Sequence, residues 1–229
     1  MTDGAVTEPL APLRIPVDLP AGRVEVSGDL ALPGDAWAFA AIAHGAGAGY
    51  RHPFLTGFAR SLAQQGVGTL RFNFPYVEAG RRMPGPAAHA VATWAAVMAF
   101  ASAQTGAPTF AVGKSYGGRM ASMAAAEGAI APSGLVYLGY PLHPPGAPDK
   151  PRVAHLPAVG PPQLFVEGRT DPFVDPHSQL EEAVATCRDA EIAWLDGGHS
   201  FEVKGRKRAA DEIGAGLAPL VAEWMRDRM

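Results

Sequence analysis

The chain has a single cysteine, Cys187, among its 229 residues. One cysteine cannot close an intramolecular disulfide, and it cannot supply the thiolates of a cysteine-based zinc site. Basic residues are not in excess either, because 19 Lys and Arg stand against 22 Asp and Glu, for a formal net charge of −3. The densest basic run, Lys204–Arg208, is expected to begin a helix as a solvated face. Without a basic stripe we expect no nucleic-acid partner.

The sequence also lacks a hydrophobic run long enough to cross a bilayer comfortably. Its most apolar stretch, residues 87–103, is about a turn too short and is interrupted by polar side chains, so it predicts a buried helix. Residues 1–10 carry Asp3 and Glu8 without the basic start of a secretory signal. From these absences we expect a cytoplasmic protein with no membrane partner, and the oligomeric state stays open.

What the chain does have is a regular alternation of short apolar runs with longer helical patterns. Hydrophobic residues make up 48% of the sequence, which is enough for one sizeable core. The alternation predicts βαβ units and a mostly parallel central sheet with helices on both faces. We expect strands in 13–32 (two, with a turn at Ala21-Gly22), 37–43, 68–74, 109–112, 135–138, 163–167 and 191–195, and helices in 53–65, 86–104, 115–127, 176–188 and 205–225. We expect one domain over residues 1–229, with residues 1–11 as a flexible extension.

Residues 140–162 break this alternation. The segment is rich in proline, shows no clear period and is too short to hold a helical lid domain. We expect it to form a rigid, extended cover over one edge of the site, with no cap domain.

The motif Gly113-Lys114-Ser115-Tyr116-Gly117 carries the strongest functional signal. It follows a predicted strand and begins a predicted helix, which is the setting of a G-x-S-x-G nucleophile elbow. The two flanking glycines fit a turn too tight for side chains, and Gly118 would let the helix approach the sheet. Ser115 would then be a strained nucleophile at a helix N-terminus, which favours negative charge. The alternative is an accidental match in a glycine-rich chain.

Two nucleotide-binding motifs overlap with these glycine-rich stretches, and neither is complete. A P-loop ending at Gly113-Lys114-Ser115 would need a glycine where Pro108 stands. A dinucleotide fingerprint over residues 45–49 would need its last glycine at Tyr50, and no acid ends the following strand at Asn73. We therefore expect no cofactor and no metal.

The stretch His44-Gly45-Ala46-Gly47 follows a predicted buried strand and suits an oxyanion loop. The backbone N–H groups of Ala46 and Tyr116 would then face the charge that develops in the transition state, where one such donor is typically worth about 10²–10³ in rate. Small residues let a substrate reach the backbone, so His44, Gly45 and Gly47 are candidate substrate-binding residues. The alternative is a plain glycine turn.

A serine nucleophile needs a base, and the base needs an acid that orients it. His199 lies between the last predicted strand and the last predicted helix, which is where this base belongs. Three other histidines downstream of Ser115 fit surface or structural roles: His143, His155 and His177. Asp171 follows a predicted strand in a short loop and is the expected acid. Asp196 is a rival, because only three positions separate it from His199.

Two adjacent arginines, Arg81 and Arg82, lie in the loop after the predicted strand 68–74, at the edge of the sheet where ligands bind. The planar guanidinium matches a carboxylate or a phosphate, so one of them is a candidate for orienting an anionic substrate group. The alternative is an internal ion pair, most simply with Glu78.

Together these residues resemble the α/β-hydrolase superfamily. The chain is similar to its small, capless members near dienelactone hydrolase, and more closely to the family of testis-expressed protein 30 and its bacterial relatives. The matching segments cover most of the chain: AHGAGAG at His44, RFNFPYVEAGRRMPGP from Arg71, GKSYGGRMAS from Gly113, LGYPLHPPG from Leu138, LFVEGRTDPF to Phe173 and GGHSF at His199. The resemblance implies a triad of Ser115, Asp171 and His199. Dienelactone hydrolases proper carry a cysteine nucleophile, so the resemblance does not extend to their lactone substrates.

These observations predict a serine hydrolase that cleaves a small-molecule carboxylic ester or thioester through an acyl-Ser115 intermediate. The alternative is a non-catalytic interaction module that kept the hydrolase fold.

Overall fold

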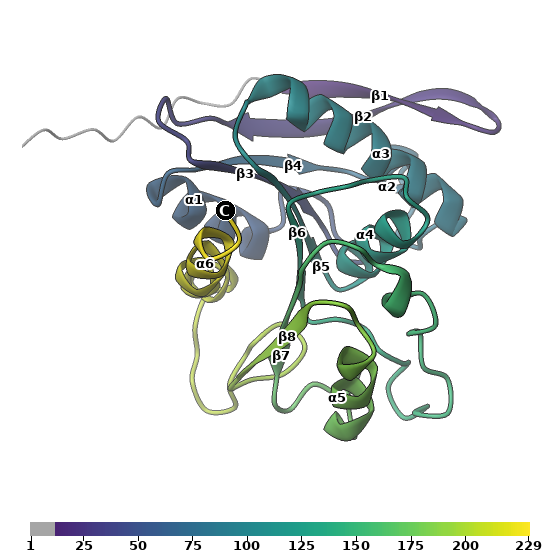
Figure 1. Ribbon diagram of the computed structural model, residues 1–229, viewed down its shortest axis with the longest axis vertical. Coiled ribbons are helices and arrows are strands. Elements are labelled where there is room, and N and C mark those ends of the chain that lie inside the picture. Colours follow the sequence, from purple (N-terminus) through teal and green to yellow (C-terminus); the bar gives the residue numbers. More distant parts are fainter. Residues whose placement is uncertain (1–11) are drawn as a thin grey trace, which may run out of the picture.

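The computed structural model describes residues 12–229, and the extension expected over residues 1–11 lies outside them. Its centre is an eight-stranded sheet in the order β1-β2-β4-β3-β5-β6-β7-β8 (Figure 1). β1 (Leu13–Leu19) and β2 (Gly22–Ala31) form an antiparallel hairpin, and β2 pairs antiparallel with β4 (Val67–Phe72). All further pairings are parallel, and each strand pairs with the next. From β4 the order continues with β3 (Ala38–Ala43), β5 (Thr109–Lys114), β6 (Gly134–Leu138), β7 (Gln163–Gly168) and β8 (Ala190–Leu195). The predicted mostly parallel sheet is confirmed.

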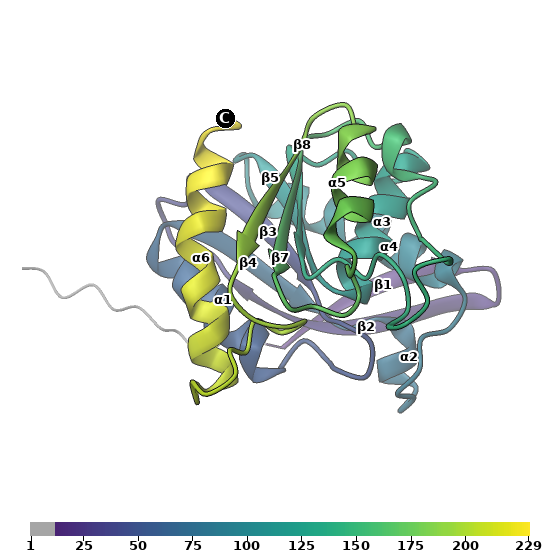
Figure 2. The ribbon, with the colours of Figure 1, turned by 90° about the horizontal axis from the view of Figure 1, so that it is seen from below.

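Helices cover both faces of the sheet (Figures 1 and 2). α1 (Pro53–Gln64) and α6 (Ala210–Arg226) pack on one face, and α3 (Ala87–Gln104), α4 (Tyr116–Ala126) and α5 (His177–Ala185) pack on the other. Residues 12–229 contain no separate cap domain. In the same part of the chain, none of the helices combines the length and the apolar character needed to span a membrane.

The two hydrophobic cores follow from the alternation of side chains along buried strands. In β3, Phe39 and Ala41 join the core under α3 and α4, while Ala40 and Ile42 join the core under α1 and α6. Since successive side chains of a strand point to opposite faces, a run with no polar residue must be covered on both sides. This is why the continuous apolar runs of the sequence correspond to central strands.

Three local expectations need correction. A short helix, α2 (Pro75–Glu78), follows β4 where a loop was expected, and a proline at its first position suits a helix start. The basic run Lys204–Arg208 does not begin a helix, because Gly205 adopts a φ of 84° and α6 begins only at Ala210. The proline-rich segment contains a single 3-10 turn at Leu156–Ala158, and it packs through buried side chains instead of only covering an edge.

The parallel strands end at one edge of the sheet, and their following loops meet there. His44 follows β3, Ser115 follows β5, Asp171 lies three residues after β7, and His199 lies four residues after β8. Chain segments far apart in sequence are thereby brought to one place.

Candidate active site

Ser115 lies at the sharp turn between β5 and α4. Its backbone has φ 49° and ψ −114°, a conformation that residues with a side chain rarely adopt and that costs on the order of 1–3 kcal/mol. A Cβ on Gly113 would lie 2.1 Å from the nitrogen of Gly118, and a Cβ on Gly117 would lie 2.7 Å from the carbonyl oxygen of His44. The turn therefore needs glycine at both flanking positions.

The side chains of Ser115, His199 and Asp171 form a continuous hydrogen-bonded series. Nε2 of His199 is 2.8 Å from Oγ of Ser115, and Nδ1 of His199 is 2.6 Å from Oδ2 of Asp171. The other carboxylate oxygen, Oδ1, accepts the N–H of Phe173 at 2.8 Å. Since a carboxylate is only an acceptor, Nδ1 of His199 carries the proton and Nε2 is left to accept the Ser115 hydroxyl.

Burial keeps the imidazole of His199 in its neutral form. Desolvation lowers the pKa of His199 below its ordinary value of 6.5, although the hydrogen bond that His199 donates to Asp171 acts in the opposite direction. The ring of Phe173 stacks on the imidazole with 4.2 Å between ring centroids. The geometry and the pKa both suit a group that accepts a proton near neutral pH.

Asp196, the rival acid, is exposed, and no hydrogen bond joins it to His199 among the residues that the structure describes. The loop that carries His199 is held by a different group: Nζ of Lys114 donates to the carbonyl oxygen of His199 at 2.8 Å. Lys114 is buried, and desolvation lowers its pKa to about 8 in spite of the neighbouring carboxylates of Asp171 and Glu167.

The backbone N–H groups of Ala46 and Tyr116 remain available beside the serine. Ala46 is the second residue of a turn closed by the N–H of Ala48 on the oxygen of Gly45, and this turn does not use the Ala46 N–H. Tyr116 is the first residue of α4, so its N–H has no acceptor within the helix. A Cβ on Gly45 would lie 3.5 Å from Cβ of Ser115, which shows that this loop passes directly beside the serine.

The fold, the strained serine and its neighbours agree with the family comparison. The family model described as alpha/beta hydrolase domain matches residues 38–225. The chain belongs to the alpha/beta hydrolase family.

Solved structures show the same fold over nearly the whole chain. A dienelactone hydrolase from Anabaena variabilis is 21% identical, with a TM-score of 0.70 and coverage of 96% of this chain and 99% of that one. An alpha-beta serine hydrolase homologue from Coxiella burnetii is 18% identical, with a TM-score of 0.72 and coverage of 96% and 100%. A serine hydrolase without lid from Xanthomonas campestris is 23% identical, with a TM-score of 0.68 and coverage of 95% and 98%.

In this alpha/beta hydrolase, His44 orders the loop after β3. Its Nε2 accepts the N–H of Phe74 at 3.2 Å, so its Nδ1–H is the donor to the oxygen of Gly45 at 2.7 Å. Burial lowers the pKa of His44 to about 4, which keeps the ring neutral. His44 lines the cavity and stays a candidate substrate-binding residue, although both of its ring nitrogens already have protein partners that shape the loop. Gly47, at φ 75°, allows the turn and does not line the cavity.

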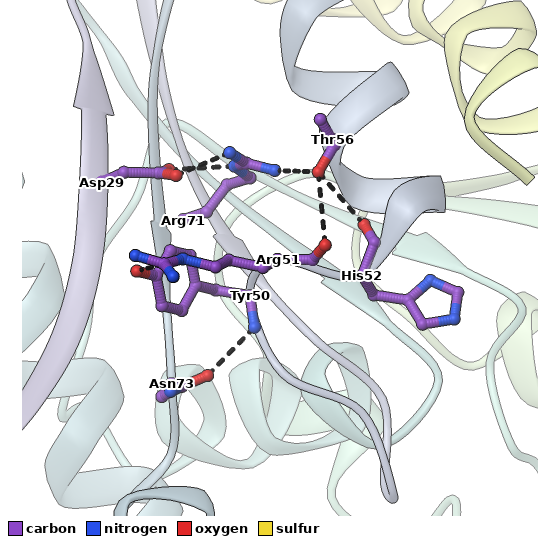
Figure 3. A network of polar contacts seen from close by, with 7 residues as sticks. All are labelled: Asp29, Tyr50, Arg51, His52, Thr56, Arg71 and Asn73. Carbon is purple, nitrogen blue, oxygen red and sulfur yellow. Dashed lines mark hydrogen bonds and ion pairs between the residues drawn. The ribbon is translucent and has the colours of Figure 1, made fainter. Parts of the chain in front are cut away.

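A polar network anchors the far end of the same loop, and sequence reasoning missed it. Figure 3 shows the guanidinium of Arg71 between Asp29 and Thr56. Its Nη2 lies 2.6 Å from Oδ2 of Asp29. The N–H of Tyr50 donates to the side chain of Asn73 at 2.9 Å. These contacts connect β2, β4 and the start of α1, and so they fix the loop that precedes α1.

A cavity of about 460 Å³ opens over Ser115 and His199. Its lining is partly apolar, with side chains from several loops and from the start of α1: Ala46, Ala48, Phe54, Leu55, Met83, Pro84, Pro141 and Phe173. It also contains Arg119 of α4 and Arg152 of the proline-rich segment, which sequence reasoning missed. Arg119 had a detectable signal, because it stands four residues after Ser115 on a predicted helix.

Arg81 and Arg82 lie outside this cavity, although Met83 and Pro84 line it. Both arginines are exposed, and Arg81 borders a separate, smaller hollow. The alternative ion pair with Glu78 is also wrong. The Glu78 carboxylate accepts from Ser27 and from the Asn73 amide and pairs with Arg14 at 3.4 Å, so its acceptors are already in use.

Metal ligands do not gather at this site: no group of three or more His, Cys, Asp or Glu side chains in residues 12–229 is placed to hold a metal ion.

Proposed function

We propose that the protein is a serine hydrolase that cleaves a carboxylic ester or thioester through an acyl-Ser115 intermediate. The observation that carries the proposal is the hydrogen-bonded series from Asp171 through His199 to a strained Ser115, at 2.6 and 2.8 Å. The structural similarity of the chain to a serine hydrolase homologue from Coxiella burnetii and a serine hydrolase from Xanthomonas campestris supports it. Within the hydrolases, the segments GKSYGGRMAS and LGYPLHPPG favour a place near the testis-expressed protein 30-like family.

In the first half of the proposed reaction, Oγ of Ser115 attacks the carbonyl carbon while Nε2 of His199 takes the hydroxyl proton. The buried carboxylate of Asp171 stabilises the imidazolium that forms. The carbonyl oxygen becomes an oxyanion, which the backbone N–H groups of Ala46 and Tyr116 stabilise in this proposal. The tetrahedral intermediate then collapses, and the leaving alcohol or thiol receives the proton from His199.

In the second half, water replaces the leaving group. Nε2 of His199 accepts a proton from the water as its oxygen attacks the acyl carbon, and a second oxyanion forms in the same place. Its collapse releases the carboxylic acid and returns the proton to Ser115. The cycle consumes one water and needs no redox partner.

A fluorophosphonate probe tests this proposal directly, because it reacts with activated serines. We expect the wild-type protein to be labelled at Ser115 and Ser115→Ala to remain unlabelled. Ser200, at the exposed rim of the cavity, provides a matched control, since Ser200→Ala should label like wild type. A folded wild-type protein that never labels would favour a non-catalytic module instead. A library of esters and thioesters would then define the substrate.

A further inference from the structure

The cavity over Ser115 is lined by positively charged side chains, and within residues 12–229 no acidic side chain lines it beside them. Three cationic side chains line it, Lys114, Arg119 and Arg152, and among the described residues that line it there is no Asp or Glu. Lys114 is engaged with the carbonyl oxygen of His199. Neither arginine forms an ion pair anywhere within residues 12–229.

Arg119 reaches the cavity from the first turn of α4. Its backbone N–H donates to the oxygen of Ser115 at 3.1 Å, so the two residues are neighbours on one side of the helix. Nε of its guanidinium is buried and has no hydrogen-bond partner in the part of the chain that the structure describes. Buried donors are nearly always satisfied in proteins, and an unsatisfied one requires an explanation.

Arg152 reaches the cavity from the proline-rich segment, where its backbone N–H and its carbonyl oxygen are both hydrogen-bonded. Its N–H donates to the oxygen of Leu142 at 2.7 Å, and its carbonyl oxygen accepts the hydroxyl of Tyr140 at 2.9 Å. The guanidinium is only partly buried, and the fixed backbone directs it into the cavity.

A second set of contacts fastens this segment to α4 beside the two arginines. Oγ of Ser122 donates to the carbonyl oxygen of Arg119 at 2.8 Å, so it accepts Nε2–H of His155 at 2.7 Å. Burial and the charge of Arg119 lower the pKa of His155 to about 4, so this imidazole is neutral and adds no third charge.

The two guanidinium groups are close enough to disfavour each other. After burial itself, the charge of Arg119 is the largest cause that lowers the pKa of Arg152. Partly desolvated like charges without a counter-ion destabilise a fold, and among residues 12–229 neither arginine has an acidic partner. An anion between them would remove the repulsion.

We propose that Arg119 and Arg152 form an anion subsite that binds a carboxylate or phosphate group carried by the substrate, remote from the bond that is cleaved. The inference rests on the proposed hydrolase function and narrows it to esters or thioesters with an acidic group. Guanidinium groups bind both anions by paired N–H donors, and their partial burial strengthens the attraction. The subsite replaces the anion clamp that the sequence suggested at Arg81 and Arg82.

Matched pairs of esters test the subsite through turnover. The first pair places the acidic group on the acyl chain and compares monomethyl adipate with methyl hexanoate. The second pair places it on the leaving group and compares the acetyl ester of hydroxyhexanoate with hexyl acetate. We expect at least one acidic ester to be preferred by wild type. Arg119→Gln and Arg152→Gln should each raise its KM by about 10- to 100-fold, since a charge-assisted hydrogen bond is lost, and should leave the neutral partner within about twofold.

Two further variants separate binding from structure. Arg119→Lys keeps the charge and should restore part of the preference for the acidic ester. Arg60→Gln removes one exposed positive charge on α1 and should change neither ester nor the melting temperature. If wild type shows no preference in either pair and binds neither anion, or if the glutamine variants damage acidic and neutral esters equally, the subsite is overturned.

Calorimetry with Ser115→Ala tests the subsite without turnover. We expect adipate or inorganic phosphate to bind this variant, and the comparison of the two decides between carboxylate and phosphate. The double variant Ser115→Ala, Arg119→Gln should bind neither. Anion binding by a protein that cleaves no ester would retain the subsite and refute the hydrolase. Cleavage of neutral esters with no anion binding would retain the hydrolase and refute the subsite.

Discussion

Asp171 shows how one buried carboxylate can fix the tautomer of a histidine. The side chain is 1% exposed, and its two oxygens accept one N–H from His199 and one from Phe173. An amide at this position would offer an NH₂ group to one of these two donors. The imidazole would then have to present its other tautomer to Ser115.

Asp171→Asn should therefore lower kcat strongly while the protein stays folded. In a serine-protease triad the equivalent change costs about 10⁴ in kcat, and we expect a loss of that order here. Asp196→Asn is the matched control, because Asp196 is exposed and lies in the same loop as His199. Steady-state kinetics on any cleaved ester measures both. The reverse result would make Asp196 the acid.

His199 also sets the acid limb of the rate profile. The imidazole must be neutral to accept the Ser115 proton, and burial lowers its pKa below 6.5. Activity should thus persist below pH 6.5 and fall only as the pH drops through the lowered pKa. A profile of kcat/KM against pH measures this limb. A rate that stays flat to about pH 4 would contradict a histidine base, and a midpoint above 6.5 would contradict the effect of burial.

Among the secondary-structure elements, the junction of β5 with α4 is packed too tightly for a side chain at Gly113. A Cβ on Gly113 would lie 2.1 Å from the backbone nitrogen of Gly118, and backbone atoms cannot move aside as a flexible side chain can. The strand end and the helix start are therefore held in mutual contact, and this contact presents Ser115 at the edge of the sheet.

Gly113→Ala should destabilise the protein by about 1–3 kcal/mol and lower kcat, since the overlap must be relieved by moving α4. Gly106→Ala provides the comparison: its Cβ would meet nothing within 4 Å, and its backbone is not in the left-handed region. Chemical denaturation measures the difference in the free energy of unfolding. Equal stability of the two variants would show that the junction tolerates a side chain.

Lys114 connects β5 to the loop between β8 and α6 through the carbonyl oxygen of His199. Lys114→Met should lower kcat more than it raises KM, because the amine holds the histidine loop and does not face the bond being cleaved. Lys204→Met is the matched control on an exposed lysine. A rise in KM at unchanged kcat would indicate that Lys114 binds substrate instead.

At the scale of the whole molecule, the sequence predicted those strands and site residues that short, local stretches of sequence specify. β3 reads AFAAIA and β5 begins TFAV, and such uninterrupted apolar runs predict strands covered on both faces. Ser115, Asp171 and His199 each follow a strand, so chain order alone brings them to one edge. The start of α6 was missed because it depends on Glu212, whose carboxylate accepts the N–H of Ala209 at 3.1 Å. The place of Arg152 in the cavity was not predicted, because it depends on hydrogen bonds to Tyr140 and Leu142, and these leave no periodic pattern in the sequence.

Two neutral histidines, one buried and one partly buried, make the stability of the whole fold sensitive to acid. His44 and His155 both have a pKa near 4 in the folded protein, against 6.5 when exposed. The unfolded chain therefore binds more protons between these values, so stability is complete above pH 6.5 and declines as the pH falls toward 4. We expect the melting temperature to fall over this window. His155→Asn should reduce the slope, and an unchanged melting temperature from pH 6.5 to 4 would contradict the prediction.

The hairpin that begins the described chain also protects the sheet at its edge. β1 is the outermost strand, and its exposed positions carry Arg14, Pro16 and Asp18. A proline is tolerated in a paired strand where its nitrogen faces away from the partner, so a strand approaching β1 meets a position with no donor. It would also have to desolvate two charged side chains. Aggregation by adding strands to this edge is thereby disfavoured, and Pro16→Val, which supplies a donor and a β-branched side chain, would be expected to promote it.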